Sequence, residues 1–300
     1  MSVTQRGKVT YMIRLMATDM DGTLLNGDHV VGEENIRAIK AAQQLGVKVV
    51  VATGRSYLEA SIPLKEAGLT CPVIGVNGAE VRDENGQQLL VRGIDKQIAR
   101  QAARQLEALD IYFEIYTNKG TFTNDRAQGM ALLIDIFLTS NPDTPLPHVE
   151  AGANERYDKG HITVVENYNN LFNDESQTVY KFLAFSSNPA SLEKASELLQ
   201  TIEGLAISSS GKENLEITSV YAQKGLALEW LCQNEGISLN EVMAIGDNYN
   251  DLSMMEKAGY SVAMGNAPED IKNRCTHVTT TNREDGVAKA IQQLIMVPSS

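Results

Sequence analysis

The sequence has few of the residues that build disulfide frameworks or sulfur and nitrogen metal sites. Its 300 residues include three cysteines and four histidines. The cysteines Cys71, Cys232 and Cys275 are odd in number and far apart, and none forms a CxxC pair. The histidines share no metal-ligand spacing. We therefore expect reduced thiols, as in a cytoplasmic protein.

Long apolar runs and an excess of positive charge are also missing. No run approaches the length of a membrane span, and residues 1–12 lack the apolar core of a signal peptide, so we interpret them as a loose N-terminal extension. The 26 basic and 38 acidic residues give a net charge of −12, which argues against nucleic acid or an anionic membrane as the main partner. A phosphorylated substrate is not excluded, because a metal ion and a few cations reverse the field inside one cleft.

The most informative segment is residues 13–25, an apolar run that ends in Asp19 and Asp21 and continues into Gly22 and Thr23. Such a run is typical of a buried strand in a parallel sheet, and it would place both aspartates at the carboxyl end, where open α/β sheets bind ligands. Two carboxylates one residue apart repel each other unless a cation lies between them. An acidic surface turn is the alternative.

Two further segments carry groups suited to an anion. The apolar run 47–52 ends at Thr53 and Gly54, and the strand–helix–strand order makes it a parallel neighbour of the first strand. A hydroxyl followed by a glycine amide can hold a phosphate oxygen. Lys224 opens an apolar helix, a position that disfavours a cation unless an anion is nearby.

The apolar run 241–245 is predicted to be another strand of the core. Asp247 follows just past its end, and Asn250 and Asp251 lie in the next turn before another helix. The sequence therefore predicts a third set of polar groups at the end of a core strand.

Taken in order, DMDGT from Asp19, ATGR up to Arg55, Lys224 and GDNYND from Gly246 resemble the four motifs of the haloacid dehalogenase (HAD) superfamily of phosphohydrolases. The detail resembles the Cof-type subgroup, subfamily IIB, in which a C2B-type cap lies between the second and third motifs. The resemblance covers about Ile13 to Leu294. It implies an α/β fold with a Rossmann-like core, a parallel sheet and an inserted α+β cap domain.

The pattern along the chain gives the expected domain limits. We expect the core at 13–92 and 213–300 and the cap at 93–212, with core pattern resuming at 214–218. Residues 96–109 have the spacing of an amphipathic helix, and short strands follow. Residues 139–160, with three prolines, are expected to be rich in loops.

The resemblance also implies a role for each motif residue. It makes Asp19 the nucleophile and Asp21 the general acid and base, and Mg²⁺ the cofactor. The metal ligands would be Asp19, the backbone carbonyl of Asp21, and Asp247. The groups that hold the phosphate would be Met20, Thr53, Gly54, Lys224 and Asn250. Asp251 would support the metal waters or orient Lys224.

The implied function is a Mg²⁺-dependent phosphatase of a small phosphorylated metabolite, either a sugar phosphate or a flavin-pathway phosphate, acting through an aspartyl-phosphate. One alternative is a phosphomutase, which needs a bisphosphate activator and releases little phosphate. Another is a non-catalytic sensor of a phosphorylated ligand, which has no need of both Asp19 and Asp21. Three residues keep open interpretations: Asn77 either faces the cleft or is a plain turn residue, and Lys119 and Arg126 are candidate substrate contacts for which a solvated surface role is favoured. The sequence indicates no oligomeric state.

Overall fold

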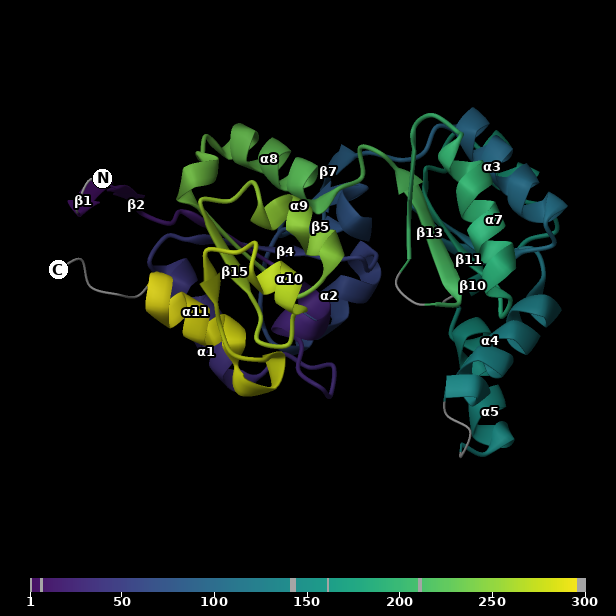
Figure 1. Ribbon diagram of the computed structural model, residues 1–300, viewed down its shortest axis with the longest axis horizontal. Coiled ribbons are helices and arrows are strands. Elements are labelled where there is room, and N and C mark those ends of the chain that lie inside the picture. The colour runs from purple at the N-terminus through teal and green to yellow at the C-terminus, as the bar shows by residue number, and fades with distance from the viewer. Residues whose placement is uncertain (1, 6–7, 141–143, 161, 210–211, 296–300) are drawn as a thin grey trace. The chain divides into compact units, whose positions relative to one another are not determined.

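The computed structural model describes residues 2–5, 8–140, 144–160, 162–209 and 212–295. The chain divides into two compact units, one made of Met1–Val91 with Tyr221–Ser300 and the other of Arg92–Val220 (Figure 1). The second unit is thus inserted between the two halves of the first. The expected α/β fold class with an inserted α+β cap is confirmed.

The first unit is built on an eight-stranded sheet of order β16-β15-β14-β3-β4-β5-β6-β7. Its strands are β3 (Leu15–Thr18), β4 (Lys48–Ala52), β5 (Val73–Gly75), β6 (Glu80–Arg82), β7 (Gln88–Val91), β14 (Val242–Gly246), β15 (Tyr260–Ala263) and β16 (His277–Val278). Neighbours from β16 to β5 are parallel, whereas β6 and β7 pair antiparallel. The carboxyl ends of β14, β3 and β4 therefore lie next to one another.

Helices cover both faces of this sheet, which is why β3 and β14 are buried along their whole length. Met16 belongs to the apolar cluster that includes residues of α1 and α11, and Leu15 belongs to the cluster that includes residues of α8. The helices of this unit are α1 (Glu33–Gln44), α2 (Tyr57–Glu66), α8 (Lys224–Glu235), α9 (Leu252–Met255), α10 (Glu269–Lys272) and α11 (Gly286–Leu294). Short helical turns occur at Met20–Leu24, Val76–Gly78, Leu239–Glu241, Tyr249–Asp251 and Asn282–Glu284.

The second unit contains a six-stranded sheet of order β10-β9-β8-β11-β13-β12, antiparallel except for the β10–β9 pair. Its strands are β8 (Tyr112–Thr117), β9 (Gly120–Thr123), β10 (Ile162–Val164), β11 (Val179–Phe185), β12 (Leu205–Ser208) and β13 (Asn214–Ser219). Its helices are α3 (Lys96–Ala108), α4 (Arg126–Ser140), α5 (Leu146–Asp158), α6 (Asn169–Asn173) and α7 (Pro189–Gln200). An apolar cluster with Phe113, Phe182 and Ile217 joins one sheet face to α3, α6 and α7.

The expected return to the core at 214–218 is wrong. Strand β13 pairs antiparallel with both β11 and β12 and so belongs to the second unit, which ends at Val220 and not at 212. Alternation such as that of 214–219 is typical of an antiparallel sheet with one exposed face, but it does not identify the neighbouring strands. The order of pairing, with β13 between β12 and β11, comes from tertiary packing.

The loop expected over 139–160 is also largely helical. Helix α4 runs to Ser140 and α5 begins at Leu146, with Pro145 as its N-cap and Pro147 in its first turn. Proline is tolerated in a first helical turn because the N–H that it lacks has no partner there. Residues 141–143, with the remaining proline, lie outside the described residues.

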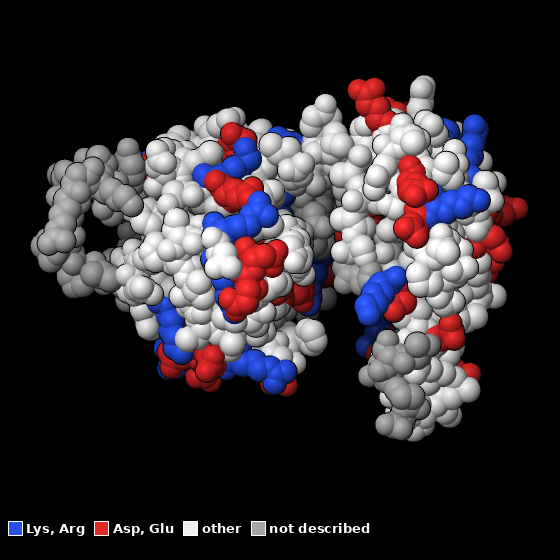
Figure 2. Space-filling model, viewed as in Figure 1, with Lys and Arg blue, Asp and Glu red and all other residues white. Residues whose placement is uncertain are grey.

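Three other features bear on the expectations. Within the expected N-terminal extension, β1 (Ser2–Gln5) and β2 (Lys8–Tyr11) pair antiparallel as a separate two-stranded sheet, whereas residues 1, 6 and 7 lie outside the described residues. None of the described helices has the length and apolar character needed to cross a membrane. On the face seen in Figure 2, acidic and basic side chains are interspersed rather than gathered by sign.

Candidate active site

The site lies at the adjacent carboxyl ends of three strands in the first unit. Asp19 directly follows β3, Thr53 directly follows β4, and Asp247 directly follows β14. The Asp19 N–H donates to the carbonyl oxygen of Ile245 (2.9 Å), and the Thr53 N–H donates to that of Ile74 (2.8 Å). These bonds continue the sheet ladder for one residue, so the polar side chains start from a rigid edge.

Lys224 forms a buried ionic centre with two aspartates. Its side chain has no exposed surface, and its Nζ donates to Asp19 Oδ1 (2.6 Å) and to Asp251 Oδ1 (2.7 Å). Burial alone lowers the pKa of Lys224, but the carboxylates of Asp19 and Asp251 outweigh it and raise that pKa above its ordinary value. Lys224 is therefore a fixed positive charge beside Asp19.

Lys224 does not fully compensate for the burial of the neighbouring carboxylates and for their repulsion of one another. Burial, and then the negative charge of Asp251, raise the pKa of Asp19 from its ordinary 3.8 to about 8. Burial is likewise the main reason that the pKa of Asp247 is raised to about 6. Ligand atoms of Asp19, Asp247 and Asp251 all lie within 4.8 Å of one another. Such a group of oxygen donors suits a hard divalent cation.

The hydrogen bonds of Asp251 distinguish it from the other two aspartates. Its Oδ1 accepts from Lys224, and its Oδ2 accepts from the N–H groups of Asp247 and Asn248, each at 3.0 Å. Asp251 is fully buried and thus accepts three hydrogen bonds, one from an ammonium group and two from the backbone. This geometry suits a residue that orients Lys224 and the turn after β14 rather than a metal ligand.

Asp247 is held in place by its neighbours. Its Oδ1 accepts from the Thr23 hydroxyl (2.8 Å) and its Oδ2 from the Asn266 amide (3.4 Å). Gly22 lies against it: a Cβ there would lie 2.4 Å from Asp247 Oδ2, and the φ of Gly22 is +81°. Glycine is therefore required in the Asp-x-Asp-Gly turn for two reasons, the close approach and the backbone conformation.

Asp21 points its carboxylate at Arg55 and is outside the group of three aspartates. Arg55 Nε donates to Asp21 Oδ2 (2.7 Å) and Arg55 Nη2 donates to Oδ1 (2.5 Å), a bidentate pair that is half exposed on the Asp21 side. The bonds to Asp21 raise the pKa of Arg55. Arg55 belongs to the second motif, but the sequence predicted no role for it. Only its position in that motif pointed to it.

The remaining predicted residues lie on the same loops. Met20 is buried and begins the turn after Asp19, and Thr53 is fully buried, with its Oγ1 accepting from the Arg55 N–H (3.1 Å). Gly54 follows Thr53. Asn250 is exposed and its Nδ2 donates to Asn77 Oδ1 (3.1 Å). The ligand contacts expected of Met20, Thr53, Gly54 and Asn250 stay predictions.

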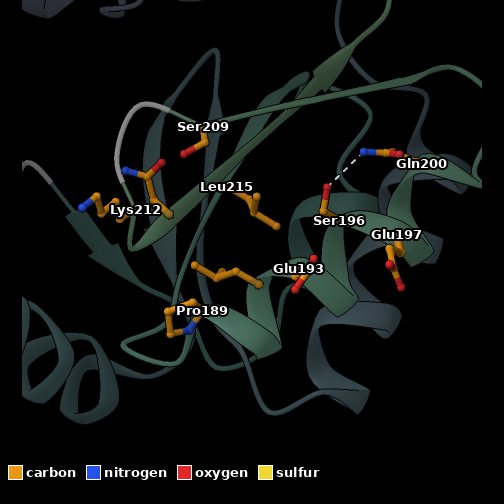
Figure 3. A pocket seen from close by; sticks show the side chains of 10 residues that line it. Pro189, Glu193, Ser196, Glu197, Gln200, Ser209, Lys212 and Leu215 are labelled. Carbon is orange, nitrogen blue, oxygen red and sulfur yellow. Dashed lines mark hydrogen bonds between the residues drawn. The ribbon is translucent and has the colours of Figure 1, made fainter.

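The two cations singled out in the second unit have partners there. Lys119 Nζ pairs with Asp174 Oδ2 (3.0 Å), and Arg126 Nη2 donates to Asn154 Oδ1 (3.0 Å) while its guanidinium lies 4.7 Å from the Tyr157 ring centroid. A hollow of about 590 Å³ in this unit is lined by α7, by Ser209 and Lys212, and by the start of β13 (Figure 3). Its lining includes Glu193, Glu197 and Lys212, and none of the predicted site residues.

Comparisons with known proteins agree with this geometry. Residues 16–291 match the family model of haloacid dehalogenase-like hydrolases. The chain is 36% identical to Phosphatase YwpJ of Bacillus subtilis, over 94% of this chain and all of that protein. It is 35% identical to the 5-amino-6-(5-phospho-D-ribitylamino)uracil phosphatase YwtE of the same organism, over 94% of this chain and 98% of that protein.

Solved structures give the same result. A haloacid dehalogenase-like hydrolase from B. subtilis superposes with a TM-score of 0.80 at 36% identity, over 94% of this chain and all of that one. The match spans both units and includes the segments that carry Asp19, Lys224 and Asp247. The chain belongs to the haloacid dehalogenase-like hydrolases, as a phosphatase of the Cof-type subgroup.

Proposed function

We propose that this protein is a Mg²⁺-dependent phosphatase that hydrolyses a small phosphorylated metabolite through an aspartyl-phosphate on Asp19. The observation that carries the proposal is the contact of Asp19 with the buried Lys224, beside the carboxylate of Asp247. A fixed cation next to a carboxylate reduces its repulsion from a phosphate dianion, which a nucleophilic carboxylate must approach.

Asp19 and Asp247 are the side chains that would hold the metal, and the backbone carbonyl of Asp21 would be a further ligand. Asp251 already accepts three hydrogen bonds, from Lys224 and from two backbone N–H groups, and supports the other groups instead. When bound, Mg²⁺ neutralises negative charge on the phosphoryl group and on the carboxylates. Thr53, the amides of Met20 and Gly54, Lys224 and Asn250 bind the phosphoryl oxygens.

The reaction has two steps. A carboxylate oxygen of Asp19 forms a bond to phosphorus as the bond from phosphorus to the ester oxygen breaks, and Asp21 gives that oxygen a proton. Water then attacks phosphorus, Asp21 takes its proton, and phosphate and the Asp19 carboxylate are released. Because Arg55 binds both carboxylate oxygens of Asp21 in this structure, one of those bonds has to open before Asp21 serves the leaving oxygen.

The subgroup and the relatives of this chain support a proposed substrate class. One relative is named for 5-amino-6-(5-phospho-D-ribitylamino)uracil, a phosphate on a polyhydroxylated chain attached to a pyrimidine. A sugar phosphate or such a flavin-pathway phosphate is therefore the proposed substrate, in the cytoplasm. No nucleic-acid or membrane partner is proposed.

The first experiment measures phosphate release from p-nitrophenyl phosphate with Mg²⁺ and with a chelator. We expect turnover only with the metal, and a loss of about a thousandfold or more in Asp19→Asn because the nucleophile is removed. Asp28→Asn, which changes an exposed aspartate of the same unit, is the matched control and should keep full activity. A folded, metal-loaded protein without turnover contradicts the proposal.

The intermediate has its own test. Borohydride reduces an acyl phosphate, so quenching the enzyme during turnover and reducing it should convert Asp19, and no other aspartate, to homoserine, as read by peptide mass spectrometry. Turnover without conversion of Asp19 to homoserine would contradict the aspartyl-phosphate intermediate but not the phosphatase activity. A panel of sugar phosphates and ribityl phosphates then ranks substrates by kcat/KM.

A further inference from the structure

Three consecutive residues after β5 adopt a backbone conformation that side chains rarely allow. The φ angles are +48° at Val76, +55° at Asn77 and +100° at Gly78. Glycine adopts this region freely and asparagine does so at moderate cost, but a β-branched valine is an outlier there. Such strain persists only where the surroundings hold it, and it gathers at functional sites.

Hydrogen bonds tie this turn to the loop after β4. The Val76 N–H donates to the carbonyl oxygen of Arg55 (2.9 Å), and the Asn77 N–H donates to that of Thr53 (2.9 Å). The backbone of the turn is therefore hydrogen-bonded directly to the segment that contains the predicted phosphate-binding residues Thr53 and Gly54.

The same turn packs against the start of α8. A Cβ at Gly78 would lie 2.4 Å from the carbonyl oxygen of Gln223, the residue before Lys224. This approach is possible only for glycine. The turn thus contacts two of the segments that make up the site.

The Asn77 side chain reaches a third segment. Asn250, in the turn after β14, donates from its Nδ2 to Asn77 Oδ1 (3.1 Å). The same carboxamide lies over Gly54, where a Cβ would be 3.4 Å from Asn77 Oδ1 and 3.6 Å from Nδ2. Asn77 therefore bridges the loops that follow β4 and β14.

We propose that Asn77 is a positioning residue that orients the Asn250 amide for the phosphoryl group. A primary amide has two N–H donors. The bond to Asn77 uses one of them and fixes the amide plane, which leaves the other in a constant direction for a phosphoryl oxygen. The inference rests on the proposed function, because it assigns Asn250 a phosphoryl contact.

A plain turn role for Asn77 predicts a different behaviour. Asparagine is common at positive φ in any turn, and its removal then changes stability alone. The variant Asn77→Gly separates the two roles because glycine accepts the φ of +55° without strain but has no side chain. Asn77→Ala removes the side chain and strains the backbone, so its melting temperature should lie below that of Asn77→Gly.

The test is a double-mutant cycle of Asn77→Gly and Asn250→Ala, read as kcat/KM for p-nitrophenyl phosphate and as the inhibition constant of inorganic phosphate. We expect Asn77→Gly to lower kcat/KM and to raise the inhibition constant, each by about tenfold, which is the scale of one misaligned hydrogen bond to a charged group. The double variant should have the same values as Asn250→Ala alone. Asn85→Gly, at an exposed position of the β6–β7 hairpin, should leave both values unchanged. Effects that multiply, or an Asn77→Gly protein with wild-type values, overturn the inference.

Failure of the proposed function is recognised separately. If the wild type shows no turnover, the same cycle is run on the binding of orthovanadate with Mg²⁺, measured by calorimetry. Weaker binding in Asn77→Gly, with no further loss in the double variant, supports the role of Asn77 although the phosphatase proposal has failed. Multiplying effects, or a wild type that binds no orthovanadate, overturn the role of Asn77.

Discussion

At the scale of single residues, Lys224 is the group on which the others depend. It is fully buried and is the cation shared by Asp19 and Asp251, both of which are also buried. Removing charges from water is costly, and the cost is recovered only while each charge keeps its partner. The arrangement therefore serves to hold a carboxylate and a cation ready in one geometry rather than to add stability.

This reasoning predicts that Lys224→Met destabilises the first unit. It leaves two buried carboxylates without a cation, so the free energy of unfolding should fall by about 3–5 kcal/mol near pH 8.5, and by less near pH 6, where Asp19 can take up a proton. Urea unfolding followed by the fluorescence of Trp230, the single tryptophan, measures the change. Lys257→Met removes a half-exposed lysine paired with Glu229 and should cost no more than about 0.5 kcal/mol. Equal stabilities of the two variants would contradict the prediction.

Arg55 leads to a prediction about the leaving group. If Arg55 holds Asp21 for its acid role, Arg55→Met should lower kcat/KM more for an alkyl phosphate than for p-nitrophenyl phosphate, by about tenfold or more. The reason is that an alkoxide needs a proton to leave, whereas nitrophenolate does not. Arg55→Lys, which retains the charge without the bidentate geometry, should fall in between. An equal loss on both substrates would assign Arg55 to phosphate binding instead.

At the scale of elements, the start of α8 sets the position of Lys224. The Gly225 N–H donates to the Ser253 hydroxyl (3.0 Å), and a Cβ at Gly225 would lie 1.9 Å from the Ser253 carbonyl oxygen. Helix α8 and helix α9, which contains Ser253, are therefore in contact through their backbones at this point. A side chain at Gly225 has to push the first turn of α8, and Lys224 with it, away from α9.

We accordingly predict that Gly225→Ala lowers stability by about 1–3 kcal/mol through overpacking and lowers kcat more than KM changes, because Lys224 is displaced from Asp19. Circular dichroism during urea unfolding and steady-state kinetics provide the two readouts. Gly152→Ala, in α5, is the control: a Cβ there meets nothing within 4 Å, and alanine favours a helix, so it should be neutral or stabilising. Wild-type kinetics in Gly225→Ala would show that α8 adjusts without moving Lys224.

The elements also show which parts of the fold a sequence can predict. Strands β3, β4 and β14 were recognisable because almost all of their residues are apolar and buried from both faces. Strand β13 is predicted in the wrong sheet because its alternating pattern does not identify β11 and β12 as its neighbours. Helix α5 is not predicted because prolines, which are frequent in loops, lie at its start.

The residues of the candidate site also divide into those that the sequence predicts and those that depend on tertiary contacts. Residues that occupy motif positions were predicted together, and the structure brings Asp19, Lys224, Asp247 and Asp251 into one cluster. The contact of Arg55 with Asp21 depends on how the loops after β3 and β4 face each other, which no local pattern encodes. The strained conformation of Val76 is likewise a result of tertiary contacts, since valine alone disfavours it.

At the scale of the whole molecule, the predicted catalytic and metal residues all belong to the first unit, although that unit is interrupted by Arg92–Val220. Trp230 lies in α8, so its fluorescence follows the unit that carries the site. Within the described part of this unit, Asp19 and Asp247 have raised pKa values, about 8 and about 6, and these make its stability depend on pH.

The direction of that dependence follows from linkage. A carboxyl group whose pKa is higher in the folded than in the unfolded state stabilises the fold fully below its unfolded pKa, and this contribution is lost as the pH rises through the folded pKa. Without a metal, the first unit should therefore lose stability between about pH 4 and pH 8, as first Asp247 and then Asp19 ionise in the folded state. A divalent cation binds the ionised forms and offsets this loss.

The last prediction is that the rise in melting temperature produced by Mg²⁺ increases with pH. Thermal unfolding followed by Trp230 fluorescence at about pH 5.5 and about pH 8.5, with Mg²⁺ and with a chelator, should give a larger metal effect at the higher pH, because the ligands no longer have to release protons. The variant with both Asp19→Asn and Asp247→Asn has neither group to ionise, so both the pH dependence and the metal effect should be reduced. A metal effect that is equal at the two pH values, or larger at the lower one, would mean that the cation binds elsewhere than at Asp19 and Asp247.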